Sequence, residues 1–259
     1  MLDRVRYLLL QVRNGDDPMR QQEVRCFARA LGTTVDAIGV FDLLNDELKP
    51  SHMSAADVLL LGGSGHYSAA GEGDWLERAL DSLRSVHAAR KPTFASCWGF
   101  QAMARAMGGR VVNDPAHAEV GTHRLRLTGA GRRDPVFSPL GPEFLGHMGH
   151  EDCVIELPPN ATLLASSERV ENQAYRFDDA PIYCTQFHPE LNREDLMQRV
   201  RQYPHYVERI AGLPPERFDE MIEDATETEA LLPRFVALVV GEEDAVKDKP
   251  TDGRPWDSR

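Results

Sequence analysis

Four short apolar runs in the first hundred residues alternate with segments whose apolar side chains recur at helical spacing. The expected strands span 7–12, 35–40, 57–61 and 92–96. The expected helices span 21–31, 75–86 and 99–107. This order is typical of βαβ units, so the sequence predicts an α/β fold with a mostly parallel central sheet flanked by helices. In such a sheet the ligand crevice forms at the carboxyl ends of the strands.

After these units the pattern changes to short alternating segments separated by Gly, Pro and Asn, which is typical of hairpins. These segments span 124–127, 153–157, 162–166 and 182–187. We expect them to add an antiparallel portion to the sheet. Further on, Leu231, Leu232, Phe235, Leu238 and Val239 share one helical face, which predicts a C-terminal helix.

Acidic side chains outnumber basic ones, 41 to 29, giving a formal net charge of −12. This balance argues against binding to nucleic acid or anionic lipid, which requires clustered Lys and Arg. The segment 216–259 holds 13 acidic and 6 basic side chains, and 244–259 is expected to be a disordered tail. We find no run of about 18 apolar residues and no signal-peptide pattern, so we expect a cytoplasmic protein that binds no membrane.

The four cysteines, Cys26, Cys97, Cys153 and Cys184, are too few and too far apart for a disulfide framework. Three of them lie in expected helices or strands and are interpreted as packing residues. Cys97 differs, because it is the centre of Ala-Ser-Cys-Trp-Gly at 95–99, an expected strand-to-helix turn. This pattern is typical of a nucleophile elbow, which presents a reactive side chain at the positive end of a helix.

A reactive thiol needs a base, and the base needs an orienting group. The segment Gln-Phe-His-Pro-Glu at 186–190 supplies both, since positions two apart in an extended chain project to the same side. Pro189 favours extended geometry at His188 and so stiffens this arrangement. The sequence therefore predicts a triad of Cys97, His188 and Glu190, with Glu190 holding the imidazole in one tautomer.

Acyl chemistry also needs N–H donors for the charge that develops on the carbonyl oxygen. The backbone N–H of Trp98 is one candidate for this oxyanion hole. Gly62 and Gly63, which directly follow an apolar strand, supply another, because glycine lets the backbone approach a substrate closely. The glycines at 62–65 lack the spacing of a phosphate-binding loop, so no nucleotide is expected there.

A cluster of His147, His150, Glu151 and Asp152 resembles a set of metal ligands. It lacks the HExxH helical spacing, however, and it falls in an expected turn. We therefore predict no metal site and no cofactor.

These segments together resemble class I glutamine amidotransferases. The resemblance rests on Cys-x-Gly-x-Gln at 97–101, the glycine pair after a strand, and Gln-Phe-His-Pro-Glu at 186–190, in that order. The segment Met-Gly-His-Glu-Asp-Cys-Val at 148–154, with the Leu-Pro and Leu-Leu-Ala-Ser-Ser segments that follow it, resembles the GMP-synthase-like branch. The resemblance covers about 1–192 and implies a flavodoxin-like amidotransferase fold.

The resemblance implies hydrolysis of a glutamine side-chain amide through a γ-glutamyl thioester. Cys97 would be the nucleophile, His188 the general base and acid, and Glu190 its orienting group. The oxyanion hole would comprise Gly62, Gly63 and Trp98. The residues implied to bind the substrate are Gln101, which would contact the glutamine, and Gly149, His150, Glu151 and Asp152, whose backbone would receive its α-amino and carboxylate groups.

Three departures from the family pattern bear on the substrate. Ala95 stands where Gly is usual, Gly-Gly-Ser-Gly-His at 62–66 stands where Gly-Gly-Pro is common, and Gly149 replaces a usual Ser or Asn. The last change weakens the expected recognition of the α groups. The resemblance therefore implies a γ-glutamyl amide more firmly than glutamine itself.

The chain is expected to divide into an amidotransferase-like domain at 1–192, a helical extension packed on it at 193–243, and the tail. Because the extension has no nucleotide motif, ammonia would pass to a synthetase on a separate chain. One alternative is a stand-alone γ-glutamyl hydrolase or peptidase acting on a conjugate, and another is a non-catalytic amidotransferase-like binding module. The related cysteine-elbow chaperones and proteases fit less well, because they have His where this chain has Trp98. The oligomeric state stays open.

Overall fold

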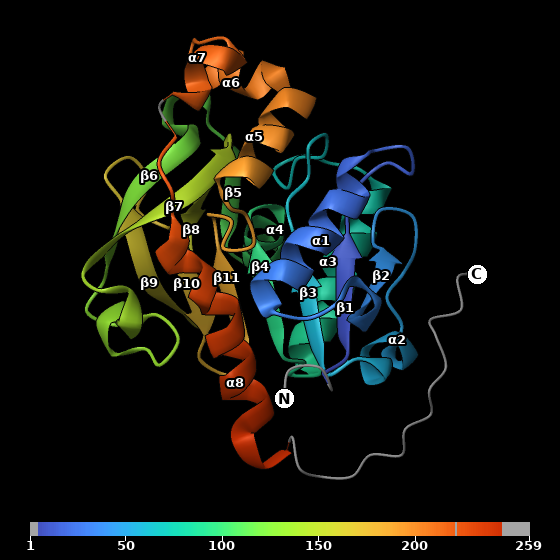
Figure 1. Ribbon diagram of the computed structural model, residues 1–259. Helices are drawn as coiled ribbons and strands as arrows, with labels where there is room; N and C mark the ends of the chain where they lie inside the picture. The colour runs from blue at the N-terminus through green and yellow to red at the C-terminus, as the bar shows by residue number, and fades with distance from the viewer. Residues whose placement is uncertain (1–4, 221, 245–259) are drawn as a thin grey trace.

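A nine-stranded mixed sheet forms the centre of the computed structural model, which describes residues 5–220 and 222–244 (Figure 1). Five neighbouring strands are parallel and lie in the order β2-β1-β3-β4-β11. They are β1 (Tyr7–Gln11), β2 (Ile38–Asp42), β3 (Val58–Leu61), β4 (Thr93–Ser96) and β11 (Ile182–Thr185). The predicted α/β class with a largely parallel central sheet is confirmed.

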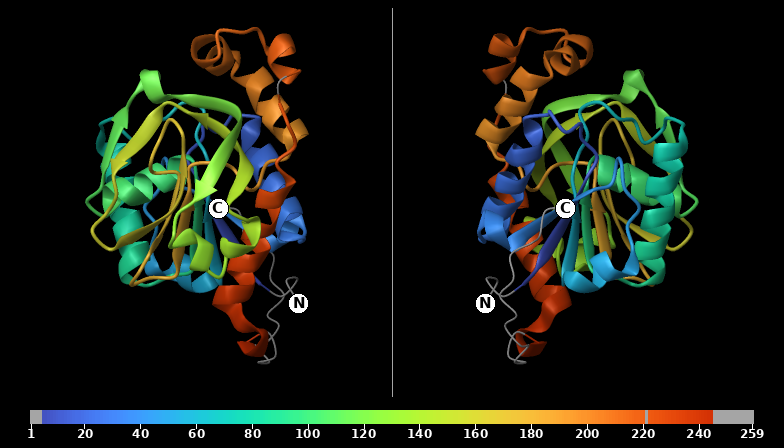
Figure 2. Two further views of the ribbon diagram at one scale, coloured as in Figure 1. Left: turned by 90° about the vertical axis from the view of Figure 1, so that its left-hand side faces the viewer. Right: turned by 90° about the vertical axis from the view of Figure 1, so that its right-hand side faces the viewer.

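Helices cover both faces of this parallel portion (Figures 1 and 2). On one face lie α1 (Met19–Leu31) and α8 (Leu231–Asp244), and on the other lie α3 (Asp74–Ala88) and α4 (Trp98–Ala106). Every residue of β1, β3, β4 and β11 is buried. Burial on both faces explains why these strands are continuous apolar runs rather than alternating ones. The short helix α2 (Pro50–Ala55) precedes β3.

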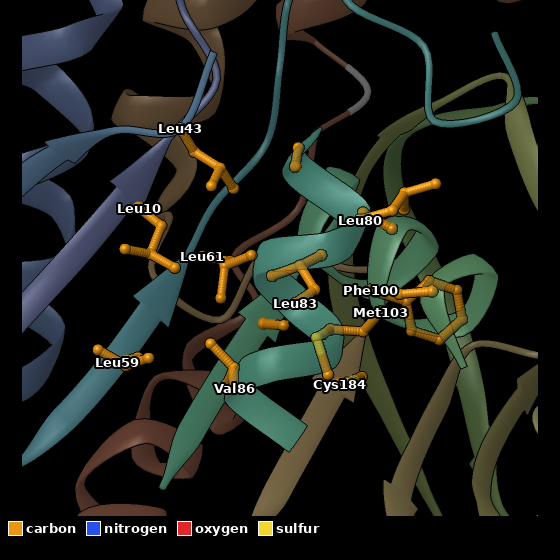
Figure 3. Packing of buried hydrophobic residues seen from close by; sticks show 14 of the residues in the cluster. Leu10, Leu43, Leu59, Leu61, Leu80, Leu83, Val86, Phe100, Met103 and Cys184 are labelled. Carbon is orange, nitrogen blue, oxygen red and sulfur yellow. The ribbon is translucent and has the colours of Figure 1, made fainter. Parts of the chain in front are cut away.

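The core beneath α3 and α4 joins Leu61 of β3, Phe100 of α4 and Cys184 of β11 (Figure 3). Burial raises the pKa of Cys184 to about 12. Burial likewise raises the pKa of Cys26 and of Cys153 to about 12. These three cysteines are buried and protonated, as expected of packing residues.

The second strand begins later than predicted. Val35–Ala37 form a 3-10 helix, and β2 starts at Ile38. Val35 is 47% exposed and precedes the strand, in the 3-10 helix. The predicted end of the first helix is confirmed, since Gly32 adopts the left-handed conformation with φ of 65°.

An antiparallel portion extends the same sheet beyond β11, as predicted. It consists of β10 (Ala174–Phe177), β9 (Ala161–Ser167), β6 (Glu119–Leu127) and β7 (Glu143–His150). A separate two-stranded sheet pairs β5 (Arg110–Asn113) with β8 (Asp152–Glu156).

Two parts of the prediction for this region need correction. The segment 182–187 pairs parallel with β4 as well as antiparallel with β10, and its strand ends at Thr185. The turn expected at 147–152 is wrong, because this segment contains the end of β7 and the start of β8. Eight residue pairs between β6 and β7 outweigh the weak strand preference of the Gly and His residues in β7.

The chain after the sheet is helical. Three helices stand together at the top of Figure 1, α5 (Arg193–Gln202), α6 (Pro204–Ile210) and α7 (Pro215–Asp219), while α8 runs down the sheet. In α8 the predicted apolar face is partly wrong, since Val236 is buried whereas Leu238 is 47% exposed. The expected disordered tail lies outside the described residues, apart from Asp244 at the end of α8. None of the helices in the described ranges is long and apolar enough to cross a membrane.

Candidate active site

Cys97 occupies a sharp turn between β4 and α4. Its backbone has φ of 52° and ψ of −105°, and only one other non-glycine residue in the described chain, Arg90, has a positive φ. Such a conformation costs on the order of 1–3 kcal/mol, which the surrounding packing must offset. Small neighbours permit the turn: a Cβ on Gly99 would lie 2.6 Å from Cβ of Leu61 and 3.2 Å from Cβ of Ala95. The turn places the thiol at the start of α4, where the helix dipole favours negative charge.

His188 and Glu190 lie on the loop that follows β11. His188 Nδ1 contacts Glu190 Oε1 at 2.7 Å, and both side chains are buried. The backbone N–H of His188 donates to the carbonyl oxygen of His147 in β7 at 2.9 Å, which fixes the loop against the sheet. The two side chains therefore lie together, as the spacing predicts.

The glycine loop after β3 lies against both the Cys97 thiol and the His188 imidazole. A Cβ on Gly63 would lie 2.9 Å from His188 Cε1 and 3.5 Å from Cys97 Sγ. Any side chain at Gly63 would thus collide with the imidazole, which explains on steric grounds why this position is glycine. The N–H of Trp98 belongs to the first turn of α4, where backbone donors lack partners within the helix. Gly63 thus lies against both the thiol and the imidazole, and Trp98 directly follows the cysteine at the start of α4.

Charge around His188 stabilises its protonated form. Burial opposes protonation, but the Glu190 carboxylate and Cys97 outweigh this effect and raise the pKa of His188 to about 9. Burial of Glu190 also opposes its ionisation, yet His188 and Arg199 lower the pKa of Glu190 to about 2. The pair is therefore an imidazolium and a carboxylate near neutral pH, in which Glu190 stabilises the positive ring.

Arg199 of α5 connects this pair to a buried charge network. Its Nη1 lies 3.6 Å from Glu190 Oε1, and its Nη2 lies 3.9 Å from Glu23 Oε1. Glu23 also accepts hydrogen bonds from Arg13 and Gln11. The Glu23 carboxylate lies under the glycine loop, since its Oε1 is 2.1 Å from where a Cβ on Gly62 would stand.

This network was not predicted from the sequence, although one residue gives a signal for it. Glu23 falls four residues after Met19 and four before Phe27, on the apolar face of α1. A carboxylate on that face has to find a buried cation. Nothing in the local sequence, however, indicates that Arg13 and Arg199 are those cations.

Two cavities meet at Cys97. The larger, of about 310 Å³, is lined by residues of the glycine loop, α4, β7, β8 and α6, among them Trp98, Gln101, Gly149, Glu151, Asp152 and Arg209. The smaller, of about 60 Å³, lies on the side of His188. Its lining is mostly apolar and includes Val120, Met148, Leu191, Leu196, Val200 and Tyr203.

Two of the predicted substrate-binding residues, Gln101 and Asp152, line the larger cavity, but their side chains already form hydrogen bonds within the protein. Gln101 Nε2 donates to the Asp152 carbonyl at 2.9 Å and to Gln186 at 3.1 Å. The Asp152 carboxylate accepts from Ser68, from the backbone of 69–70 and from Asn113. These contacts shape the cavity wall.

The other three predicted residues differ from one another. His150 contacts Glu119 through Nε2 at 3.1 Å and the Asp152 carbonyl through Nδ1, so its ring is part of the framework. Gly149 accepts from Cys97 Sγ at 3.8 Å through its carbonyl, and the space around its Cα is open. Glu151 pairs with Arg209, a residue that was not predicted from the sequence. Across the described residues, no three His, Cys, Asp or Glu side chains are arranged to hold a metal ion.

The fold and this geometry describe an α/β protein with a cysteine at a strand-to-helix elbow beside a buried His–Glu pair. A sequence model of the class-I glutamine amidotransferase family matches residues 22–200. The chain belongs to this family.

Individual relatives agree with that assignment. The chain is 30% identical to a GMP synthase [glutamine-hydrolyzing] of Streptomyces coelicolor over 171 residues, 66% of this chain and 32% of the relative. It is 30% identical to gamma-glutamyl peptidase 3 of Arabidopsis thaliana over 149 residues, 56% of this chain and 58% of the relative. The chain thus spans about a third of the GMP synthase and somewhat over half of the peptidase. The crystal structure of a Thermotoga maritima glutamine amidotransferase shares the fold, with a TM-score of 0.69, 20% identity, and coverage of 91% of this chain and 98% of that chain.

Proposed function

We propose that this protein hydrolyses the γ-amide of glutamine to glutamate and ammonia through a thioester on Cys97. The observation that carries the proposal is the 2.7 Å contact between His188 and Glu190 beside a cysteine held at an elbow. A nucleophile, a base and an orienting carboxylate in this arrangement are the elements of covalent acyl transfer.

The proposed reaction has two halves. The Cys97 sulfur attacks the γ-carbonyl carbon, the C–N bond breaks, and protonated His188 gives its proton to the leaving nitrogen. Water then attacks the thioester, His188 takes a proton from that water, and the C–S bond breaks to release glutamate. Backbone N–H groups at Gly63 and Trp98 would stabilise the oxyanion in each half, and Gly62 would let the loop approach.

Both cavities are lined by Cys97, and the one on the His188 side is small. A volume of about 60 Å³ with a mostly apolar lining accommodates ammonia or a small amine. Glutamine as substrate and a synthetase on another chain as the ammonia acceptor are consistent with the similarity to about a third of a GMP synthase. The similarity to a gamma-glutamyl peptidase supports the second candidate, a stand-alone hydrolase of γ-glutamyl conjugates.

The test is a substrate comparison with purified protein, following glutamate release from glutamine and from γ-glutamyl dipeptides. Hydrolysis of glutamine with a γ-glutamyl adduct on Cys97, detected by mass spectrometry, would support the proposal. Turnover of dipeptides with glutamine left intact would favour the second candidate. A Cys97 that reacts with no substrate and no glutamine-analogue alkylating reagent would leave only the non-catalytic binding module.

A further inference from the structure

The smaller of the two cavities at Cys97 lies on the side from which a leaving group has to depart. His188 lines this cavity and does not line the larger one. In the proposed reaction protonated His188 gives its proton to the leaving nitrogen, so that nitrogen must lie within hydrogen-bond reach of the imidazole. Trp98 and Gln101 line only the larger cavity, which suits the acyl part of the substrate. The smaller cavity is therefore the space that the leaving amine would occupy.

Tyr203 forms one wall of this smaller cavity. The residue lies at the junction of α5 and α6, helices that stand above the sheet (Figure 1). Its ring reaches the glycine loop, because a Cβ on Gly65 would lie 2.7 Å from its Cε1 atom. The ring also meets the imidazole of His66 edge-on, with 5.3 Å between the ring centroids. Only 7% of Tyr203 is exposed, so the ring is a packed wall of the cavity rather than a surface side chain.

Two hydrogen bonds fix the position of the Tyr203 ring. Its hydroxyl donates to the Asp17 carboxylate at 2.6 Å and accepts from Arg13 at 3.1 Å. Asp17 and Arg13 are themselves buried and form an ion pair with each other at 3.2 Å. Hydrogen bonds to charged groups are about twice as strong as those between neutral ones, so the ring is held firmly in place. A larger group in the cavity would have to break these contacts.

The cavity has room for only a few atoms. Its volume is about 60 Å³. At roughly 10–15 Å³ for a probe the size of a water molecule, this space holds about four to six non-hydrogen atoms. Leu196 and Val200 of α5 belong to its mostly apolar lining. Ammonia or a short amine fits such a space, whereas the amine of a longer peptide does not.

We propose that Tyr203 determines the size of the leaving group that the site accepts. The substrate class is accordingly a γ-amide that releases ammonia or a short amine, because a larger leaving group would overlap the ring. Tyr203 lies beyond residues 22–200, so the match to the family model assigns it no role. This inference rests on the proposed function, since it concerns the leaving group of the same reaction.

The test compares glutamine with γ-glutamyl benzylamide as substrates of the full-length protein. Benzylamine is about as basic as ammonia, so the two amides differ mainly in the size of the leaving group. In the wild type, kcat/KM for the benzylamide should be at least about 100-fold lower than for glutamine. Tyr203→Ala should raise the ratio of the two kcat/KM values about 10-fold or more in favour of the benzylamide, because the ring is gone. Equal kcat/KM values in the wild type would overturn the inference, as would an unchanged ratio in Tyr203→Ala.

Three further variants separate the bulk of the ring from other effects. Tyr203→Phe should keep most of the discrimination, because its ring still packs against the glycine loop, and a Phe variant as permissive as Tyr203→Ala would contradict the inference. Leu196→Ala enlarges the same cavity without removing a hydrogen bond, so it should raise the ratio and serves as the test if Tyr203→Ala does not fold. Tyr67→Ala is the matched control, since Tyr67 lines only the larger cavity and its loss should leave the ratio unchanged.

A binding measurement distinguishes failure of this inference from failure of the proposed function. In a Cys97→Ala background, titration calorimetry should show that the benzylamide has a Kd at least about 10-fold higher than glutamine. Adding Tyr203→Ala or Leu196→Ala should narrow this difference. That result would support the role of Tyr203 even if the wild-type protein hydrolysed neither amide. Equal affinity for the two amides, including no measurable binding of either, would refute it whatever the turnover.

Discussion

The guanidinium of Arg199 lies 3.6 Å from Glu190 Oε1, the same carboxylate oxygen that contacts His188. The same guanidinium nitrogen also lies 3.3 Å from His188 Nδ1, so Arg199 contacts both the histidine and the carboxylate that orients it. Because Arg199 is also 3.9 Å from Glu23, it is shared by two buried acids. Its removal leaves both acids with less positive charge around them.

We predict that Arg199→Met destabilises the protein by about 3–5 kcal/mol, the usual cost of breaking a buried charge pair. The variant should also raise the pKa of Glu190 above its value of about 2, so that acid unfolding begins at a higher pH. Chemical denaturation across a series of pH values measures both effects. Arg201→Met, an exposed position on the same helix, is the matched control. Equal stability of the two variants would contradict the role given to Arg199.

A second prediction concerns stability at alkaline pH. Folding raises the pKa of His188 from 6.5 to about 9. A raised pKa gives stability that is fully present below pH 6.5 and is lost as the pH rises through about 9. The free energy of unfolding should thus fall by about 3 kcal/mol over this range, on 1.36 kcal/mol per pKa unit. His188→Gln should abolish this loss of stability. If the free energy of unfolding of that variant varied with pH as in the wild type, another group would be responsible.

A third prediction separates chemistry from backbone strain at Cys97. Both Cys97→Ala and Cys97→Gly should abolish thioester formation, because the sulfur is gone. Glycine adopts positive φ without a Cβ penalty, so Cys97→Gly should be about 1–2 kcal/mol more stable than Cys97→Ala. Thermal or urea unfolding of the two inactive variants measures the difference. An alanine variant as stable as the glycine one would show that the turn holds no strain.

A fourth prediction compares two glycines of the site. A Cβ at Gly63 would press on His188 at 2.9 Å, whereas a Cβ at Gly149 would meet no atom within 4 Å. Gly63→Ala should therefore displace the imidazole or the loop and cut activity by about 100-fold, comparable to the cost of misplacing one oxyanion donor. Gly149→Ala should change stability and turnover little. Comparable losses in both variants would mean that the open space at Gly149 is used by the substrate.

Features that depend on residues close to one another in the sequence could be predicted. The elbow at Cys97 follows from small residues around a strand-to-helix turn, and the His188–Glu190 contact follows from a two-residue spacing with Pro189 between. The strand β7 could not be predicted, because its Gly and His residues have weak strand preference and pairing with β6 stabilises it. The Glu23–Arg199 and Glu151–Arg209 pairs join segments far apart in the chain. No local pattern determines which buried charges meet.

The buried network has a consequence for how the chain folds. Tyr203 donates to Asp17 at 2.6 Å across 186 positions of sequence, and Arg13 donates to Tyr203 across 190. A charged group that is buried before its partner loses its hydration without gaining an ion pair. We therefore expect the first βα unit and α5 to dock in a single step. Closing so long a loop costs chain entropy before the stabilising contacts have formed, which slows folding. We expect the proposed active site to be the last part of the molecule to form, in the same kinetic step that joins the first βα unit to the end of α5.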